Sequence, residues 1–166
     1  MPRIWGVNAS PLILLGKISA LPLLDRLCGQ LLVPVGVEKE IFEGPEGDPA
    51  IRWLKEKNAE SIRPLSLADP IITAWDLGLG ESQVLSLARQ TPGSEALVDG
   101  SLARKCAAAV GISVRGTLGV LLLAKREGHV PRVAPLFQQL TEAGFRIAPD
   151  LLEKALRWAN ERETRL

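Results

Sequence analysis

The stretch that decides the fold class runs from residue 96 to residue 110 and reads Ala96-Leu97-Val98-Asp99-Gly100-Ser101-Leu102-Ala103-Arg104-Lys105-Cys106-Ala107-Ala108-Ala109-Val110. The first three residues are apolar and predict a short, central buried strand. The segment from Ser101 onward, which stops before Gly111, predicts a helix. One acid, Asp99, stands between the two. A strand that passes through a polar residue into a helix is the repeating unit of a parallel α/β sheet.

The same alternation of short apolar runs and longer helical patterns extends along the whole chain. It predicts further strands, over residues 3–7, 31–33 and 112–114, and an edge strand over 62–65. Helices are predicted over residues 12–17, 21–27, 35–42, 49–55, 68–77, 80–89, 118–127, 132–143 and 150–163. The sequence therefore predicts an α/β fold with a central parallel sheet of four or five strands, flanked by helices on both faces.

Local signals set several of these boundaries. Ser10 followed by Pro11 predicts an N-cap with proline at the first helical position, and Pro34 is expected to break the strand before it. The predicted C-terminal helix has an amphipathic stripe, made by Leu151, Leu152, Ala155, Leu156 and Ala159. We predict a single domain over residues 1–166, with its core over about 3–148 and this amphipathic helix over about 150–163.

Composition narrows the class of protein. The chain has 166 residues, 46% of them apolar, a net charge of +1 and no apolar run long enough to span a bilayer. Its only cysteines, Cys28 and Cys106, are predicted to be buried and reduced in a cytoplasmic protein. A single histidine excludes a His-rich zinc site and disfavours a Ser-His-Asp triad. Aromatic residues make up 4% of the chain, which argues against a base-stacking platform.

Four polar side chains stand where an α/β fold would bring them to one edge of the sheet: Asn8, Glu40, Glu81 and Asp99. Ligands of an open α/β sheet bind outside the carboxyl ends of its strands, and oxygen ligands suit hard divalent cations. Since the sequence offers no dedicated nucleophile, such a site indicates metal-assisted phosphodiester chemistry.

Each of these residues also has a purely structural interpretation. Asp99 can cap the helix that follows it, Glu81 can complement a helix dipole, and Asn8 can be a turn residue. On the predicted helix over 35–42, Glu38 and Glu40 lie equally far from the centre of the apolar stripe. Helical phase alone therefore does not choose between these two glutamates.

Other polar residues could contact a phosphate beside such a site. Ser10 is either a helix cap or, if the site is real, a phosphate contact. Thr117 is predicted to be the N-cap of the helix over 118–127, whose N-terminus would offer backbone N–H groups to an anion. Five cations form either a basic rim around the site or a solvated surface: Arg104, Lys105, Arg115, Lys125 and Arg126.

Three stretches of the chain resemble the PIN-domain family, and in particular a VapC-like branch of predicted nucleic-acid-binding proteins. Residues 7–13, Val7-Asn8-Ala9-Ser10-Pro11-Leu12-Ile13, resemble the opening strand and turn. Residues 79–88, Leu79-Gly80-Glu81-Ser82-Gln83-Val84-Leu85-Ser86-Leu87-Ala88, resemble the Gly-Glu helix start. Residues 97–104 together with Gly116-Thr117-Leu118-Gly119-Val120-Leu121 resemble the closing signature. The resemblance covers about residues 3–155.

The resemblance implies a Rossmann-like sandwich and a Mg²⁺- or Mn²⁺-dependent ribonuclease, with RNA as the substrate. Carried over residue by residue, the four acidic positions fall on Asn8, Glu40, Glu81 and Asp99, and Glu40 is chosen because it precedes the aliphatic Ile41. Many relatives are toxins paired with a small antitoxin protein. The C-terminal amphipathic helix could cap the core, pack across the two-fold axis of a homodimer, or lie beside an antitoxin helix.

Two positions depart from the family pattern. Asn8 stands where relatives have a carboxylate, and Gly100 stands where relatives often have a second aspartate. Fewer anions should lower metal affinity and ease the repulsion that raises pKa values in a metal-free acidic cluster. The sequence therefore leaves two alternatives open, a ribonuclease or a weakened PIN-like module that binds RNA or protein without cleaving. An unrelated small-molecule role is disfavoured because GxGxxG and P-loop motifs are absent from the sequence.

Overall fold

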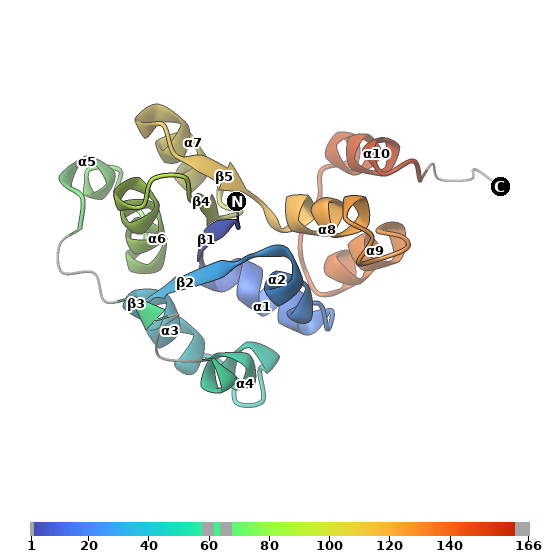
Figure 1. Ribbon diagram of the computed structural model, residues 1–166, viewed down its shortest axis with the longest axis horizontal. Coiled ribbons are helices and arrows are strands. Elements are labelled where there is room, and N and C mark those ends of the chain that lie inside the picture. Colours follow the sequence, from blue (N-terminus) through green and yellow to red (C-terminus); the bar gives the residue numbers. More distant parts are fainter. Residues whose placement is uncertain (1, 58–61, 64–67, 162–166) are drawn as a thin grey trace.

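The computed structural model describes residues 2–57, 62–63 and 68–161. Within them five parallel strands form one sheet in the order β3-β2-β1-β4-β5, with helices on both faces (Figure 1). The strands are β1 (Ile4–Val7), β2 (Gln30–Pro34), β3 (Ile62–Arg63), β4 (Glu95–Leu97) and β5 (Ser113–Arg115). The predicted α/β class and the parallel sheet are confirmed, and β4, predicted to be a central strand, is paired on both sides, with β1 and with β5.

Strand β1 is buried on both faces, as its apolar sequence requires. Trp5 and Val7 are fully buried. On the other face of the strand, a Cβ placed on Gly6 would lie 3.7 Å from Val84 of the helix α6 (Leu79–Gln90). The register pairs Val7 with Leu97, so that β1 and β4 end together at the carboxyl edge of the sheet.

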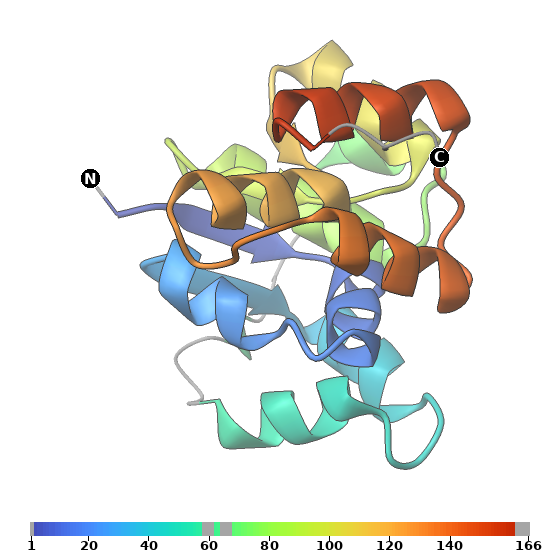
Figure 2. The same cartoon turned by 90° about the vertical axis from the view of Figure 1, so that its right-hand side faces the viewer.

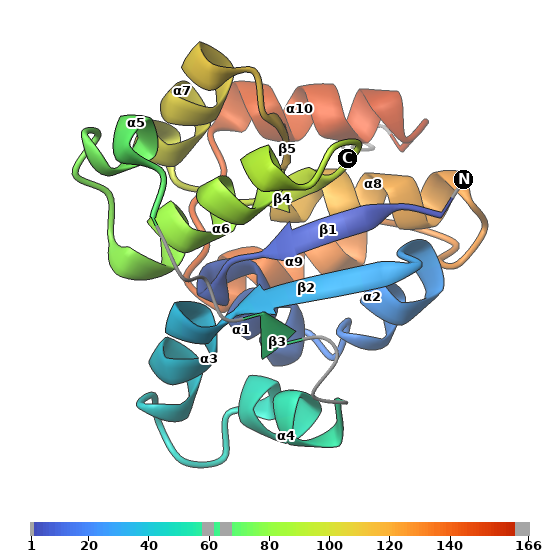
Figure 3. The same ribbon diagram turned by 60° about the vertical axis from the view of Figure 1, so that its left-hand side comes forward.

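Ten helices surround the sheet in the part of the chain that the structure describes. Helix α6 packs on β1, β2 and β4, with α5 (Pro70–Thr73) and α7 (Ser101–Val110) beside it. The opposite face carries α1 (Ala9–Lys17), α2 (Pro22–Leu27) and α8 (Thr117–Arg126), and then α9 (Ala134–Glu142) and α10 (Pro149–Trp158) outside them (Figures 2 and 3). Helices α3 (Val35–Phe42) and α4 (Pro49–Glu56) lie toward the β3 edge.

The C-terminal helix is anchored by a buried acid. Glu161 is 8% exposed and accepts hydrogen bonds from the backbone N–H groups of Val133 and Ala134, at the start of α9. Lys125 of α8 donates to Glu161 at 2.8 Å and also to the carbonyl of Ala159. Burial by itself would raise the pKa of Glu161, but these hydrogen bonds outweigh it and lower the pKa. The end of α10 is therefore fixed to α8 and α9.

Several predicted boundaries near the N-terminal half are wrong. The N-cap of α1 is Asn8 rather than Ser10, since the helix begins at Ala9, directly after β1. Pro34 does not break β2 but is its last residue and pairs in register with Arg63. The helix predicted over 68–77 shrinks to α5, because the chain turns after Thr73 and reaches a left-handed conformation at Asp76, where φ is +55°.

Other differences lie in the second half of the chain. Thr117 is the first residue of α8, and Gly116 is its N-cap. The helices predicted over 132–143 and 150–163 are shorter, as α9 and α10, because Glu161 holds the start of α9 and Asn160 ends α10 with φ at +59°. Residues 64–65 of the predicted edge strand and 162–163 of the predicted last helix lie outside the described residues.

Both cysteines are free and buried, as predicted. No helix among the described residues is long and apolar enough to cross a membrane.

Candidate functional site

Asn8 lies directly after β1, at the carboxyl edge of the sheet. Its backbone N–H donates to the carbonyl of Leu97 at 3.1 Å, which continues the pairing of β1 with β4. The side chain is 5% exposed, yet its Oδ1 receives no hydrogen bond, although the residue stands at the N-cap of α1. A buried oxygen without a donor is costly unless something binds it. Among the described residues, no group satisfies this oxygen, which leaves it available to a ligand.

Glu40 reaches the same point from α3. Its Oε1 accepts a 3.3 Å hydrogen bond from the backbone N–H of Gly80, in the first turn of α6. A Cβ on Gly80 would lie 2.6 Å from Glu40 Oε1 and 3.3 Å from Asn8 Oδ1, so these two oxygens are no more than about 6 Å apart. Glycine at position 80 leaves the space that the carboxylate occupies. Of the two glutamates that helical phase left open, Glu40 is the one that lies beside Asn8.

Glu81 follows Gly80 on α6 and is half-buried. Burial raises the pKa of its carboxyl, and the nearby charge of Glu40 raises it further. A Cβ on Gly100 would lie 2.8 Å from Glu81 Oε1. Gly100 therefore faces Glu81, and its missing Cβ leaves the space that the Glu81 carboxylate occupies.

Asp99 has a different environment. Its Oδ1 accepts from the Thr117 backbone N–H at 2.8 Å, and its Oδ2 accepts from the Thr117 hydroxyl at 2.6 Å. Asp99 thus caps α8, whereas the structural interpretation from sequence had it cap α7, whose N-cap is Gly100. In the described parts of the chain, no three His, Cys, Asp or Glu side chains form a group that could hold a metal ion. The structure brings Asn8 and Glu40 together, with Glu81 nearby. Asp99 is instead hydrogen-bonded to Thr117.

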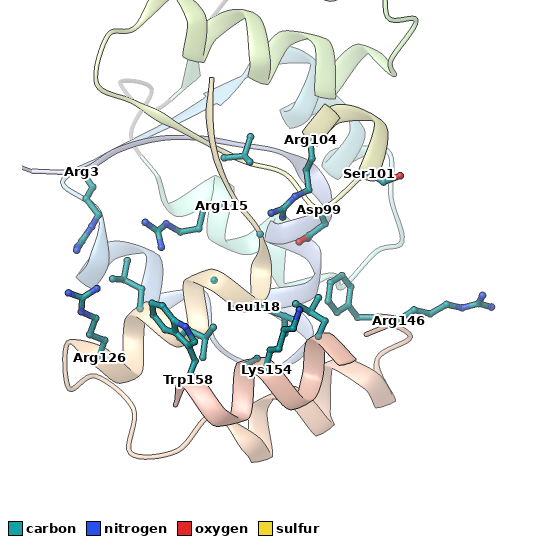
Figure 4. A pocket seen from close by; sticks show the side chains of 18 residues that line it. Arg3, Asp99, Ser101, Arg104, Arg115, Leu118, Arg126, Arg146, Lys154 and Trp158 are labelled. Atoms are coloured by element: carbon teal, nitrogen blue, oxygen red, sulfur yellow. The ribbon is translucent and has the colours of Figure 1, made fainter. Parts of the chain in front are cut away.

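The three predicted phosphate contacts differ in access. Ser10 is exposed in the first turn of α1, and Arg104 is exposed on α7. Thr117 is fully buried, and its hydroxyl donates to Asp99, so it orients that carboxylate rather than facing solvent. Arg104 and Asp99 both line a cavity of about 970 Å³ between the β5–α8 connection and α10 (Figure 4).

Sequence reasoning missed one residue that fixes the geometry. Gln83 Oε1 accepts a 2.7 Å hydrogen bond from the backbone N–H of Gly36, in the first turn of α3. This bond ties α3, which carries Glu40, to α6, which carries Glu81. Position 83 is 47 residues from position 36, so no local pattern could have indicated the contact.

A family model described as PIN domain matches residues 4–161. The chain belongs to the PIN-domain family. Membership in this family suggests nuclease activity and nucleic-acid binding in general, and PIN domains typically use divalent metals. The match does not distinguish the VapC-like branch from the rest of the family. Searches of curated proteins and of solved structures each found no match.

The candidate site offers oxygen atoms of the kind that bind a hard divalent cation. Burial is the larger cause of the raised pKa of Glu81 and the charge of Glu40 adds to it, so a cation beside these two carboxylates would offset both costs. Asn8 adds a buried amide oxygen that has no hydrogen-bond donor. Two carboxylates and an amide oxygen are the ligand chemistry that Mg²⁺ and Mn²⁺ prefer.

Proposed function

We propose that this PIN domain is an endoribonuclease that depends on Mg²⁺ or Mn²⁺ and cleaves RNA at the carboxyl edge of its sheet. The observation that carries the proposal is the buried Oδ1 of Asn8, which lacks a donor and lies beside the Glu40 carboxylate. Glu40, Glu81 and Asn8 would hold the cation, with Asp99 as the fourth polar group of the site.

When bound, the cation would activate water and neutralise charge on the phosphodiester. The chain's own residues position the parts. Gln83 holds α3 against α6, and thus Glu40 near Glu81. Thr117 orients Asp99 by two hydrogen bonds. The exposed guanidinium of Arg104, beside Asp99 in the cavity wall, would bind a phosphate of the RNA backbone.

Cleavage of a labelled RNA in Mn²⁺ tests the proposal, with Glu40→Gln and Glu81→Gln as the variants. Each substitution keeps the side-chain shape and removes one negative charge, so each should lower the cleavage rate by at least about a hundredfold. Glu38→Gln is the matched control, because Glu38 lies on the same helix, whereas the hydrogen bond from Gly80 goes to Glu40. Equal rates in Glu40→Gln and Glu38→Gln would refute the assignment.

A second candidate function is a PIN-like module that binds RNA or protein without cleaving it. It is favoured by the neutral Asn8 and by Gly100, which supplies no carboxylate and whose missing Cβ leaves the space that Glu81 Oε1 occupies. Calorimetric titration of Mn²⁺ into chelator-treated protein separates the two candidates. Heat of binding that disappears in Glu81→Gln supports the nuclease, whereas no binding up to roughly millimolar metal supports the module.

We also propose that two copies of the chain form a homodimer. Four exposed apolar side chains support this, Val35 and Phe42 on α3, Ile71 on α5 and Leu79 on α6, because α3 and α5 both pack on α6. Sedimentation of the wild type and of Ile71→Asp tests it.

A further proposal, that the chain is the toxin partner of a small antitoxin, rests on the resemblance of its motifs alone. Growth arrest on expression that needs an intact Glu81 would support it.

A further inference from the structure

The cavity between the β5–α8 connection and α10 is lined by an unusual excess of positive charge. We call it the α10 groove. Its charged lining comprises one acid, Asp99, and six cations: Arg3, Arg104, Arg115, Arg126, Arg146 and Lys154. The whole chain has a net charge of only +1, so positive charge is concentrated here. Figure 4 shows Arg3 and Arg126 at one end of the groove and Arg104 and Lys154 near its middle, whereas the side chain of Arg146 at the other end extends away from it.

Four of these cations have no ion pair among the described residues. Arg3 pairs with Glu127 at 2.6 Å, and Arg115 pairs with Glu95 at 3.2 Å. The other four are exposed and make no side-chain salt bridge within the described chain: Arg104, Arg126, Arg146 and Lys154. Unpaired cations that face one cavity repel one another, and an anionic polymer would relieve that repulsion.

An aromatic side chain stands among these cations. Trp158 of α10 lines the groove and is 77% exposed, whereas Trp5 is fully buried and Trp53 is 8% exposed. Tryptophan is on average highly buried in folded domains, so an indole that is exposed in the wall of a cavity is available to a ligand. A flat indole beside arginine and lysine side chains is suited to stack an unpaired base while the cations bind its phosphates. The low aromatic content of the sequence argued against a stacking platform, but one exposed ring in a basic groove is enough to stack a base.

The groove is rigid, because its α10 wall is fixed. Glu161 binds the N-terminus of α9 and Lys125 of α8, and Lys125 also donates to the carbonyl of Ala159, directly after α10. At the other end, Asp99 lines the groove and precedes Gly100, which faces Glu81. The α10 groove therefore reaches Asp99, one of the four polar residues of the candidate site.

We propose that the α10 groove binds single-stranded RNA, with its phosphates on Arg104, Arg126 and Lys154 and an unpaired base on Trp158. The inference rests on the proposed function, because it places the flank of the strand that this site would cleave. Single-stranded RNA fits the groove better than a duplex, because the bases of a duplex are already stacked on one another. It also fits better than an acidic peptide, because a peptide of Asp and Glu has no base to stack on the indole.

Fluorescence anisotropy with a labelled twelve-residue uridine RNA tests the inference in the presence of EDTA, where metal-dependent cleavage cannot occur. Replacing Arg126 and Lys154 together by glutamine should weaken binding about tenfold and reduce the salt slope by about 1.4, the value for two phosphate contacts on a single strand. Arg157→Gln is the matched control, since Arg157 is on α10, does not line the groove and already pairs with Glu153.

Tryptophan fluorescence gives a second readout that a merely structural role would not change. Bound RNA should quench the wild-type emission through Trp158, and Trp158→Phe should lose this quenching while it keeps most of the affinity. Trp158→Ala should weaken binding about tenfold. Because Trp158 is exposed, both variants should keep the wild-type melting temperature, which excludes unfolding as the cause.

Several outcomes would overturn the inference. Unchanged affinity in the Arg126/Lys154 double variant would do so, as would equally tight binding of a duplex RNA. Displacement of the RNA by poly-glutamate at equal charge would indicate an acidic protein segment as the occupant instead. Failure of the proposed function is distinguishable: a chain that binds RNA through these residues but never cleaves it refutes the nuclease and supports the groove.

Discussion

The substitution Asn8→Asp would restore a carboxylate beside Glu40 and gives the most direct measure of the site. The oxygens of the two side chains are no more than about 6 Å apart. At that distance, and with an effective dielectric constant of about 20, two negative charges repel by about 3 kcal/mol, and in full water by about 0.7 kcal/mol. Since Glu40 is exposed and Asn8 is buried, the cost should lie between these limits. We expect Asn8→Asp to lower the free energy of unfolding by about 1–2 kcal/mol in EDTA at pH 7.5.

A divalent cation should reverse this loss, because it binds the added charge. Urea unfolding in EDTA and in Mn²⁺ measures both effects, with Asn8→Ala as the control that removes the amide without adding charge. A double-mutant cycle with Glu40→Gln isolates the repulsion between positions 8 and 40. A coupling energy below about 0.3 kcal/mol in EDTA would refute the reasoning, since the two groups would then not be neighbours.

Three further substitutions test other parts of the structure. Glu81→Gln should lower the cleavage rate at least about a hundredfold yet stabilise the metal-free fold at pH 7.5. The folded state raises the pKa of Glu81 and so loses stability as pH rises through that pKa; the gain in the variant should therefore vanish below about pH 4 in urea titrations. Gln83→Leu should lower the cleavage rate about tenfold with little change in RNA affinity, because the hydrogen bond from Gly36 to Gln83 positions α3 against α6. An unchanged single-turnover rate would contradict this. Glu161→Gln should lower the unfolding free energy by about 2 kcal/mol at pH 7, because it weakens the charged hydrogen bond from Lys125. The pKa of Glu161 is lowered on folding, so its contribution is present above about pH 4.5 and is lost as pH falls further; a deficit of equal size at pH 3 would refute the assignment.

The strands and most helices could be predicted because their signals are local. The run from Ala96 to Val98 and the helix from Ser101 to Gly111 carry their own apolar period and glycine stop, and both appear in the structure within one residue of the prediction. Boundaries failed where a distant group sets them. Helix α9 begins where Glu161 binds its first N–H groups, 27 residues away, and no period within the helix encodes that contact.

The four polar positions at the carboxyl edge could be found from sequence, but their grouping could not. Parallel strands that end together bring Asn8 and Asp99 to one edge, as sequence order and the βαβ rule predict. Which oxygens meet depends on rotamers and on the packing of α3 against α6. The structure joins Asn8 to Glu40 through Gly80 and gives Asp99 to Thr117. Helical phase did not choose between Glu38 and Glu40; the family resemblance favoured Glu40, and the packing of α6 on α3 places Glu40 beside Gly80.

The sequence by itself determined the α/β class, the parallel order of strand and helix, and the family to which the chain belongs. Each of these depends on residue type at short spacing, which the chain carries however it is folded. The tertiary structure alone decided that Asn8 Oδ1 is buried with no donor among the described residues. It also decided that Trp158 lines one groove with four cations that have no ion pair in the same part of the chain. Those properties depend on which surfaces become neighbours, since burial and electrostatic potential are sums over atoms that are distant in sequence.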